Sequence, residues 1–400
     1  MSIIDSLTCH HVWLSFLECK KANKFIKKNE LSDFEMFVEN KEYLHIANKL
    51  KNREYVFSVP KKHIISKIAS NKKRIVYTFN REETYVLKII TFLLHKYDDV
   101  FSPNLFSFRT GKSVKEAIRL LKKNRGYYAF KLDISNYFNS IDVTILLSKL
   151  KQILNDDLLL DLFEKILTRN LVDENGTIKN EMCGAMAGIP VSAFFANIYL
   201  MDMDKFFETQ GNVYARYSDD IIIFSDNKIQ LENFRQILYQ KIEELNLVIN
   251  YKKVVNFLPD EAWDFLGFAI GKNSIDLSKN TVKKIKGKIR RKCRALYRWK
   301  NKNQLDSEKA IKATIKIFNN KFYSYEYNNE HSWSRWFFPY LTTDKSLRLI
   351  DEYFISHLRF IQTGRFTKKN YKQMPYPKLK NTGYRSLVSE FWKYKKQQPN

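Results

Sequence analysis

Two adjacent aspartates, Asp219 and Asp220, stand between two runs of strand-forming residues in YARYSDDIIIF (214–224). Residues 213–217 and 221–224 predict two strands, and the polar residues between them predict a hairpin turn. Two neighbouring carboxylates repel each other unless they are solvated or a divalent cation neutralises them, and hard oxygen ligands suit Mg²⁺. The segment therefore predicts a hairpin that carries either an ordinary acidic turn or part of a metal site.

A third aspartate, Asp133, ends another predicted strand in AFKLDISNYF (129–138). Three carboxylates at the ends of two strands could hold two Mg²⁺ ions about 3.5–4 Å apart, the arrangement that assists phosphoryl transfer. Taken alone, Asp133 has a simpler interpretation as a helix N-cap, because Asp is favoured where a strand turns into a helix.

The net charge of the chain points to a polyanionic partner. The formal charge is +26, from 69 Lys and Arg against 43 Asp and Glu, and nucleic acid is the first candidate, ahead of an anionic membrane surface. No stretch approaches the roughly 20 apolar residues that cross a bilayer, and the N-terminus lacks a signal-peptide pattern. We therefore expect a cytoplasmic protein that does not bind membranes.

The four cysteines, Cys9, Cys19, Cys183 and Cys293, are scattered without a CxxC pair. This spacing supports neither a zinc module nor a disulfide framework, so we expect four reduced thiols.

Hydrophobic patterning predicts an α+β fold. The expected order is helices to about residue 60, a strand at 72–79, a helix at 112–124, a strand, turn and helix at 127–142, helix at 143–172, a Gly-rich loop and buried helix at 184–207, the hairpin, a helix at 229–245, short strands at 247–257 and 263–271, and basic helices from about 275.

Several blocks in one order resemble the bacterial reverse transcriptases. The blocks are FKLDISNYFNSID (motif A), GAMAGIPVSAFFANIYL (motif B), YSDD (motif C), LVINYKK (motif D) and FLGF (motif E), with KKRIVYTF and SFRTGKSVKEAI similar to the fingers motifs. The resemblance implies a right-hand polymerase with N-terminal helices and fingers at 1–125, an antiparallel-sheet palm at 126–274 that includes finger helices at about 143–172, and a basic helical thumb and C-terminal region at 275–400.

The resemblance also assigns the chemistry. Asp133, Asp219 and Asp220 would bind two Mg²⁺ ions with Ile134 as a further metal ligand, and Lys253 would donate a proton to the departing pyrophosphate. The substrates implied are deoxynucleoside triphosphates (dNTPs).

Other matched positions would contact the nucleotide or the primer. Phe138 would act as an aromatic gate that excludes a ribonucleotide's 2′-hydroxyl, although a core aromatic is its simpler interpretation. The cations of 72–74 and Arg109 would grip the triphosphate, although a solvated face is equally simple for the former. The residues implied to bind substrate are Lys73, Arg74, Arg109, Phe138, Gly188, Ser192 and Tyr217, with Gly184 beside them in the motif B loop.

The C-terminal third is implied to hold the primer and the duplex. Phe265, Leu266 and Gly267 would form the primer grip. The segment 281–300 contains ten Lys and Arg and no acid, with apolar residues near helical spacing at Val282, Ile285, Ile289, Leu296 and Trp299. One face of such a helix would pack while its cations, Lys284, Lys288, Arg291 and Arg298, meet phosphates of the template–primer duplex.

Motif B departs from the usual PQGxxxSP pattern, because Met186, Ala187 and Ala193 occupy the corresponding positions. With no endonuclease or zinc motif of the mobile-intron type, the chain is most similar to the defence-associated and abortive-infection reverse transcriptases. The implied function is copying of a bound non-coding RNA into cDNA in anti-phage defence, through an RNA/DNA duplex. Two alternatives are untemplated or protein-primed DNA synthesis, and an inactive RNA-binding scaffold.

Overall fold

The computed structural model describes residues 2–22, 28–66, 73–211, 213–323 and 332–397, and the chain forms two compact units, Met1–Pro259 and Asp260–Asn400. Both units combine helices with antiparallel strands, which confirms the expected α+β class. The hairpin at 263–270, expected at the end of the palm, belongs to the second unit. The ranges proposed for fingers, palm and thumb stay a prediction.

The first unit contains the following elements. Its helices are α1 (Ile3–Ser6), α2 (His10–Ala22), α3 (Lys28–Glu39), α4 (Leu44–Lys51), α5 (Arg81–Leu93), η1 (Leu94–Val100), α6 (Val114–Lys123), η2 (Tyr137–Ser140), α7 (Val143–Ile153), α8 (Asp157–Leu167), α9 (Ser192–Tyr199), α10 (Met201–Thr209), α11 (Lys228–Glu244) and η3 (Tyr251–Lys253). Its strands are β1 (Lys61–Ser66), β2 (Lys73–Thr78), β3 (Tyr128–Asp133), β4 (Leu171–Glu174), β5 (Thr177–Asn180), β6 (Tyr214–Tyr217), β7 (Asp220–Ser225) and β8 (Val255–Phe257).

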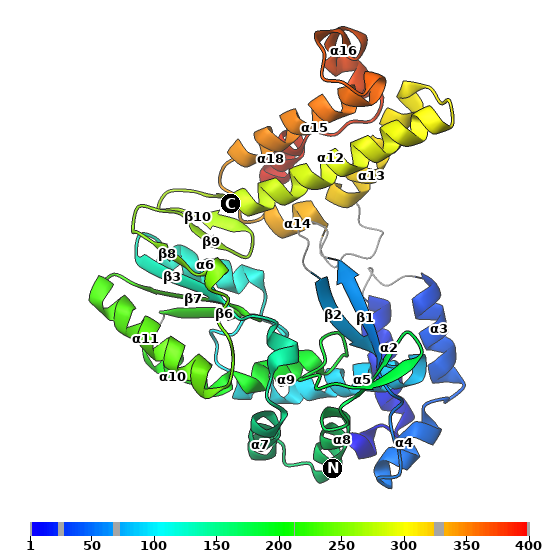
Figure 1. The fold of residues 1–400 in the computed structure, drawn as a ribbon, viewed down its shortest axis with the longest axis vertical. Helices are drawn as coiled ribbons and strands as arrows, with labels where there is room; N and C mark the ends of the chain where they lie inside the picture. Colours follow the sequence, from blue (N-terminus) through cyan, green and yellow to red (C-terminus); the bar gives the residue numbers. More distant parts are fainter. Residues whose placement is uncertain (1, 23–27, 67–72, 212, 324–331, 398–400) are drawn as a thin grey trace. The chain divides into compact units, whose positions relative to one another are not determined.

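An antiparallel sheet with the strand order β6-β7-β3-β8 lies beside α10 and α11 (Figure 1). Side chains alternate between the two faces of a strand. Phe130 of β3 packs edge-on against Tyr239 of α11, with 5.7 Å between ring centroids, so α11 covers the face that carries Phe130, Leu132 and Ile221. Lys131, Asp133 and Asp220 must therefore face away from α11.

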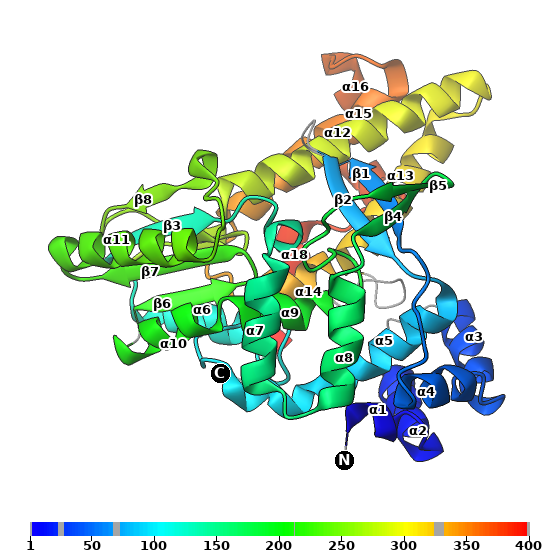
Figure 2. The same cartoon turned by 60° about the horizontal axis from the view of Figure 1, so that its bottom comes forward.

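A second sheet has the order β2-β1-β4-β5 (Figure 2). β1 pairs with β2 antiparallel and with β4 in parallel, and β4 and β5 form a hairpin. The expected strand at 72–79 is confirmed as β2 within the described residues, whereas Lys72 lies outside them. The prediction of helices up to about residue 60 is wrong after α4, which ends at Lys51, and β1 lies in a stretch for which no element was predicted. The prediction of helix throughout 143–172 is wrong at its end, where β4 begins at Leu171.

Several helices begin where the sequence offers a capping side chain. Asn80, Asp142, Asp156 and Asn227 each accept a backbone N–H of the helix that follows, at α5, α7, α8 and α11. The helix expected at 112–124 is confirmed as α6, with its predicted apolar face buried.

The second unit begins with the antiparallel strands β9 (Trp263–Phe265), β10 (Phe268–Ile270) and β11 (Ile275–Leu277). Its helices are α12 (Lys279–Lys302), α13 (Ser307–Tyr323), α14 (Trp333–Phe337), α15 (Lys345–Thr363), α16 (Lys368–Gln373), α17 (Tyr376–Asn381) and α18 (Leu387–Gln397). α12 packs against α13 and α15 through Ile285, Ile289 and Cys293. Trp299, expected on this packing face, is instead 40% exposed, because α12 extends beyond its buried stretch.

No helix within the described ranges is long and apolar enough to cross a membrane.

The cysteines differ in exposure, which predicts different reactivity. Cys9 and Cys19 are exposed, whereas Cys183 and Cys293 are buried, and burial raises the pKa of the Cys293 thiol to about 12. Because the thiolate is the nucleophile, we expect iodoacetamide at neutral pH to label Cys9 and Cys19 but neither buried thiol in the folded chain. Peptide mass spectrometry checks this, with urea-unfolded chain as the control in which all four react. Labelling of Cys293 at the rate of Cys9 would contradict the prediction.

Candidate active site

The turn between β6 and β7 presents the double aspartate. Tyr217 and Asp220 form the last pair of the ladder, so Ser218 and Asp219 are the two turn residues. Ser218 has φ of 60°. Its N–H donates to the Ser107 hydroxyl at 2.8 Å, and its carbonyl accepts from the Arg216 guanidinium at 3.2 Å. The turn that carries Asp219 is thus held from both sides of Ser218.

Asp133 and Asp220 lie directly opposite each other on β3 and β7. The Asp133 carbonyl accepts from the N–H of Asn250 at 2.9 Å, which directs the Asp133 backbone groups away from β7. The pair with Asp220 is therefore of the non-hydrogen-bonded kind, in which facing side chains come closest. Two like charges so placed destabilise a sheet unless cations neutralise them.

Two lysines supply such cations. Lys253 forms an ion pair with one carboxylate oxygen of Asp133, and the other oxygen accepts from the Asn250 side chain at 3.1 Å. Lys131 lies 3.4 Å from an Asp220 carboxylate oxygen. Asp133 is buried, whereas the Lys253 side chain is half exposed, so Lys253 has access to solvent from this position.

Asp219 belongs electrostatically to the same group. Burial, and then the charge of Asp133, raise the pKa of the Asp219 carboxyl, with a smaller contribution from Asp220. The three predicted carboxylates therefore interact across 86 residues of sequence, as the motifs imply.

The donor set fits a hard divalent cation, although no three Asp, Glu, His or Cys side chains of the described ranges already stand at metal-binding separations. The Asp133 carbonyl and the Ser135 N–H pair with Asn250 and Val248. Because backbone groups alternate in direction along a strand, the Ile134 carbonyl points to the other side, where the hairpin turn lies. Carboxylate and carbonyl oxygens are Mg²⁺ ligands, and a bound cation would relieve the repulsion between the aspartates.

Glycines let the 184–188 loop approach its neighbours. A Cβ on Gly184 would lie 2.7 Å from the Phe138 carbonyl oxygen, and one on Gly188 would lie 2.8 Å from that of Tyr77; both glycines have positive φ. Asn139 ties the same three segments together, since its amide donates to the Ile75 carbonyl at 3.3 Å and accepts from the Ala187 N–H at 2.9 Å. The loop is thus fixed to both β2 and η2.

Phe138 is partly buried beside this loop. Its ring packs edge-on against the exposed Phe108, with 6.4 Å between centroids, and lies 5.6 Å from Tyr137. Phe108 has φ of 56°, a backbone conformation that bulky residues rarely adopt and that is concentrated at functional sites. Phe138 is therefore neither fully buried nor free.

The remaining residues predicted to bind substrate divide into two groups. Lys73 and Arg74 are exposed at the start of β2, and no ion pair engages them within the described residues. The Arg109 guanidinium instead donates to the carbonyls of Ser102 and Asp98, at 2.6 and 2.7 Å. Its assignment to the triphosphate stays a prediction, and this geometry favours a supporting role for Arg109.

Ser192 also supports backbone. Its hydroxyl contacts the carbonyls of Ala185 and Met186 at 2.6 and 2.5 Å, and the residue is buried, so it shapes the loop from behind. Tyr217, which ends β6, pairs with Asp220 and lies at the edge of the carboxylate group.

In the second unit, Leu266 and Gly267 form the turn between β9 and β10, both with positive φ. The Gly267 carbonyl accepts from the N–H of Ser278 and the hydroxyl of Thr281, each at 2.9 Å. The predicted primer grip, which begins at Phe265, is therefore fixed to the start of α12.

The predicted duplex-binding cations recur along α12 at helical spacing. Burial, and then the charge of Lys321, lower the pKa of Lys288, since cations crowd this part of the helix. Lys284, Arg291 and Arg298 are exposed. This is the charge pattern of a helix that meets phosphates, and the contact itself stays a prediction.

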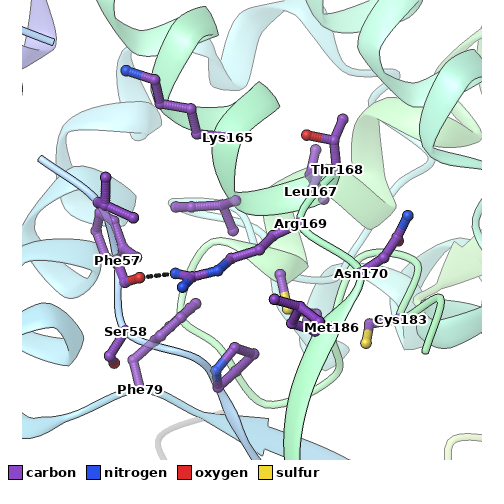
Figure 3. A pocket seen from close by; sticks show the side chains of 14 residues that line it. Phe57, Ser58, Phe79, Lys165, Leu167, Thr168, Arg169, Asn170, Cys183 and Met186 are labelled. Atoms are coloured by element: carbon purple, nitrogen blue, oxygen red, sulfur yellow. Dashed lines mark hydrogen bonds between the residues drawn. The ribbon is translucent and has the colours of Figure 1, made fainter. Parts of the chain in front are cut away.

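A cavity of about 330 Å³ lies behind the 184–188 loop, away from the carboxylates. Figure 3 shows the Arg169 side chain crossing it toward the Phe57 carbonyl, to which it donates a hydrogen bond. Cys183 and Met186 contribute its wall on the loop side. The cavity is mostly apolar and contains none of the predicted catalytic residues.

Comparison with known families decides what this arrangement belongs to. Residues 59–270, just over half of the chain, match the family "Reverse transcriptase (RNA-dependent DNA polymerase)". The chain belongs to the reverse transcriptase family. The matched range contains every residue of the carboxylate group and its two lysines.

Curated relatives of this reverse transcriptase domain include intron proteins of yeasts. A 91 kDa protein in the cob intron of Schizosaccharomyces pombe is 29% identical over 166 residues, 41% of this chain and 20% of that protein. The COX1/OXI3 intron 2 protein of Saccharomyces cerevisiae is 27% identical over 167 residues, 39% of this chain and 19% of that protein. The match therefore spans about a fifth of the length of these relatives.

Among solved structures, apo telomerase from Candida tropicalis is similar at 14% identity, with a TM-score of 0.45 over 84% of this chain and 69% of that one. Telomerase from Candida albicans, in complex with a TWJ fragment of telomeric RNA, is 13% identical, with a TM-score of 0.45 over 91% and 71% of the two chains.

Sequence reasoning missed several residues that build the site. Lys131 was detectable, because it lies two positions before Asp133 on a strand and so must share its face. Asn139, Asn250 and Ser107 had no such signal, since their partners come from distant segments. Arg216 also forms a buried ion pair with Asp204 of α10, for which the sequence contains no signal either.

Proposed function

We propose that the chain is an RNA-directed DNA polymerase that adds deoxynucleotides to a primer hydroxyl with two Mg²⁺ ions. The observation that carries the proposal is the meeting of Asp133, Asp219 and Asp220 at one end of the paired strands β3 and β7, inside a reverse transcriptase domain. Bound Mg²⁺ would activate the primer hydroxyl and neutralise the charge that develops on the leaving pyrophosphate.

The side chains of the site have separate roles in this proposal. The three carboxylates and the Ile134 carbonyl would hold the cations. Lys253 would be released from Asp133 if that carboxylate held a cation, and from its half-exposed position it would protonate the departing pyrophosphate. Lys73 and Arg74, both without an ion-pair partner in the described chain, bind the triphosphate.

The proposal extends to the template. We infer from the departures in motif B that the polymerase belongs to the bacterial defence group and copies a bound non-coding RNA. The basic face of α12 supports binding of an RNA/DNA duplex. No observation favours the scaffold alternative, since the carboxylates, Lys253 and the loop glycines are all in place.

Template exchange tests this function. The purified chain is given two primed RNAs of unrelated sequence, dNTPs and Mg²⁺, and the products are sequenced. Complementary DNA on each template, abolished by EDTA, is expected. The same product from both templates, or DNA covalently attached to a tyrosine, would instead support untemplated or protein-primed synthesis. RNA bound without any product would support the scaffold.

Phe138→Val is expected to relax sugar selection. Removing the ring opens space beside the 2′ position, and discrimination by packing against one small group amounts to about 10- to 200-fold. The kcat/KM for rUTP should therefore rise at least about tenfold relative to dTTP. Phe108→Val, which removes the ring that packs against Phe138, is the control and should change this ratio less. Equal ratios in wild type and Phe138→Val would contradict the assignment of Phe138 as the residue that excludes the 2′-hydroxyl.

A further inference from the structure

The turn and short helix after α15 expose aromatic and basic side chains together. We define the α16 surface as the exposed residues Arg365, Phe366, Lys368, Lys369, Tyr371 and Lys372. Figure 1 shows α16 beyond the end of α15, at the opposite end of the second unit from β9 and β10. None of these residues belongs to the row predicted on α12.

The charge of this region has one sign. Residues 353–389 contain eight Lys and Arg and no Asp or Glu. Among the residues that the structure describes, no acidic side chain forms an ion pair with Arg365, Lys368, Lys369 or Lys372, although ion pairs are common elsewhere in the chain. Solubility does not require such a concentration of one charge, whereas binding of a polyanion does.

The ring of Tyr371 is held in place by Arg359 while remaining exposed to solvent. The Arg359 guanidinium lies 4.2 Å from the centroid of its ring, and Arg359 is itself fixed because its Nε donates to the Met374 carbonyl at 3.0 Å. Tyr371 is nevertheless 54% exposed. One face of the ring is thus covered by a cation while the side chain remains open to solvent.

Phe366 is supported in a similar way by α15. Its ring lies 5.1 Å from those of Phe360 and His357, yet Phe366 is 60% exposed. An exposed phenyl ring has a hydration cost that stacking against a planar ligand would remove.

The turn that carries both rings is fixed internally. Asn370 is buried, and its side chain donates to the Arg365 carbonyl at 2.8 Å and to the Thr363 hydroxyl at 3.1 Å. Gly364 ends α15 with φ of 74°, which reverses the chain there. The backbone that carries the two rings and the four cations is therefore fixed before any ligand binds.

We propose that the α16 surface binds a single strand of nucleic acid, with unpaired bases stacked on Tyr371 and Phe366 and phosphates bound by the four surrounding cations. Unpaired bases expose the planar faces that such rings accept, whereas a duplex hides them in its own stack. This site is separate from the duplex contact predicted for α12.

Binding of fluorescein-labelled oligo(rU) and oligo(dT) 15-mers to the full chain, followed by anisotropy, tests the rings. Tyr371→Ala and Phe366→Ala should each weaken binding of both strands about tenfold. A blunt RNA hairpin of equal length should lose less than threefold. Trp392→Ala is the matched control, because Trp392 is 45% exposed in the same unit but donates to Asp344. Equal losses for the control, or for the hairpin, would overturn the proposal.

A charge series tests the cations. Arg365→Gln/Lys368→Gln/Lys369→Gln/Lys372→Gln should make the slope of log affinity against log salt shallower by about 3, since each phosphate contact with a single strand contributes about 0.7. The control removes four other exposed lysines, Lys41, Lys49, Lys151 and Lys228, and should leave the slope within 1 of wild type. Equal effects of both variants on the slope would mean that these four cations contribute only to the overall positive charge and form no specific site.

Two further outcomes bear on the proposal. Loss of binding to phosphatidylserine vesicles in the α16 variants, with oligonucleotide binding intact, would overturn it in favour of a membrane contact. Since the readout is equilibrium binding, Asp219→Asn should bind the 15-mers like wild type even though its synthesis is lost. Failure of the polymerase proposal and failure of this one are therefore distinguishable.

Discussion

Asp219→Asn is expected to lower nucleotide addition on a primed RNA template at least about a thousandfold, because a metal-bound carboxylate supports several kcal/mol of transition-state stabilisation. An amide keeps the size of the side chain but loses its charge and its affinity for Mg²⁺. Single-turnover extension with a 5′-labelled primer measures the rate, and raising Mg²⁺ to high concentration should recover little of it.

The same substitution should leave the fold at least as stable as wild type. Burial and the charge of Asp133 raise the pKa of Asp219, so the folded chain disfavours the charged carboxylate, and a neutral amide removes that cost. Thermal unfolding of Asp219→Asn measures this stability and shows whether the loss of synthesis comes from a loss of structure. Asp226→Asn, which changes an exposed aspartate shortly after the same hairpin, is the matched control and should keep wild-type synthesis. A wild-type rate of nucleotide addition in Asp219→Asn would contradict the assignment of Asp219 as a metal ligand.

The parts of the site that the sequence predicted are those with local signals. The hairpin around 218–219 has strand-forming residues on both sides and a polar turn between them, and the helix at 112–124 has a complete apolar stripe. Asp133 was found because a strand visibly ends there. In each case the deciding interactions lie within about a dozen residues, so a pattern in the chain reports them directly.

The parts that it did not predict depend on distant partners. β1 is a charged segment, KKHIIS, that becomes a strand because β2 and β4 supply its neighbours. β4 follows α8 after three polar residues and has only two apolar positions, Leu171 and Val172, too few for a strand pattern. Arg109 looks like a free cation in the sequence, and only the fold shows that the carbonyls of Ser102 and Asp98 occupy it. Such assignments require tertiary contacts that no local pattern contains.

The turn that carries Asp219 depends on a buried ion pair of Arg216. Arg216 is buried because side chains alternate between the two faces of β6. Tyr217 faces the carboxylates, so Arg216 faces the core, where it meets Asp204 of α10. Asp204 accepts from the Arg216 Nε at 2.7 Å and from the Tyr214 hydroxyl at 2.8 Å. Both charged side chains are completely buried. Burial alone would lower the pKa of Arg216, but Asp204 more than offsets it and raises that pKa, so the guanidinium stays charged.

Asp204→Asn should therefore destabilise the first unit by about 3–5 kcal/mol, because it leaves the Arg216 charge buried without its partner. Urea unfolding followed by far-ultraviolet circular dichroism measures the change. The matched control is Asp202→Asn on the same helix, whose carboxylate is 63% exposed and pairs with Lys149 at the surface; such a pair contributes about 0–1 kcal/mol.

A double variant separates the effect of this ion pair on stability from its effect on the turn that carries Asp219. Arg216→Met/Asp204→Leu removes both buried charges, and replacement of a buried ion pair by apolar residues is often close to neutral for stability. The double variant should therefore be more stable than Asp204→Asn. Its synthesis should nevertheless remain low, because the Ser218 carbonyl has lost the guanidinium that holds the turn. Recovery of synthesis together with stability would mean that the Ser107 hydroxyl alone positions Asp219.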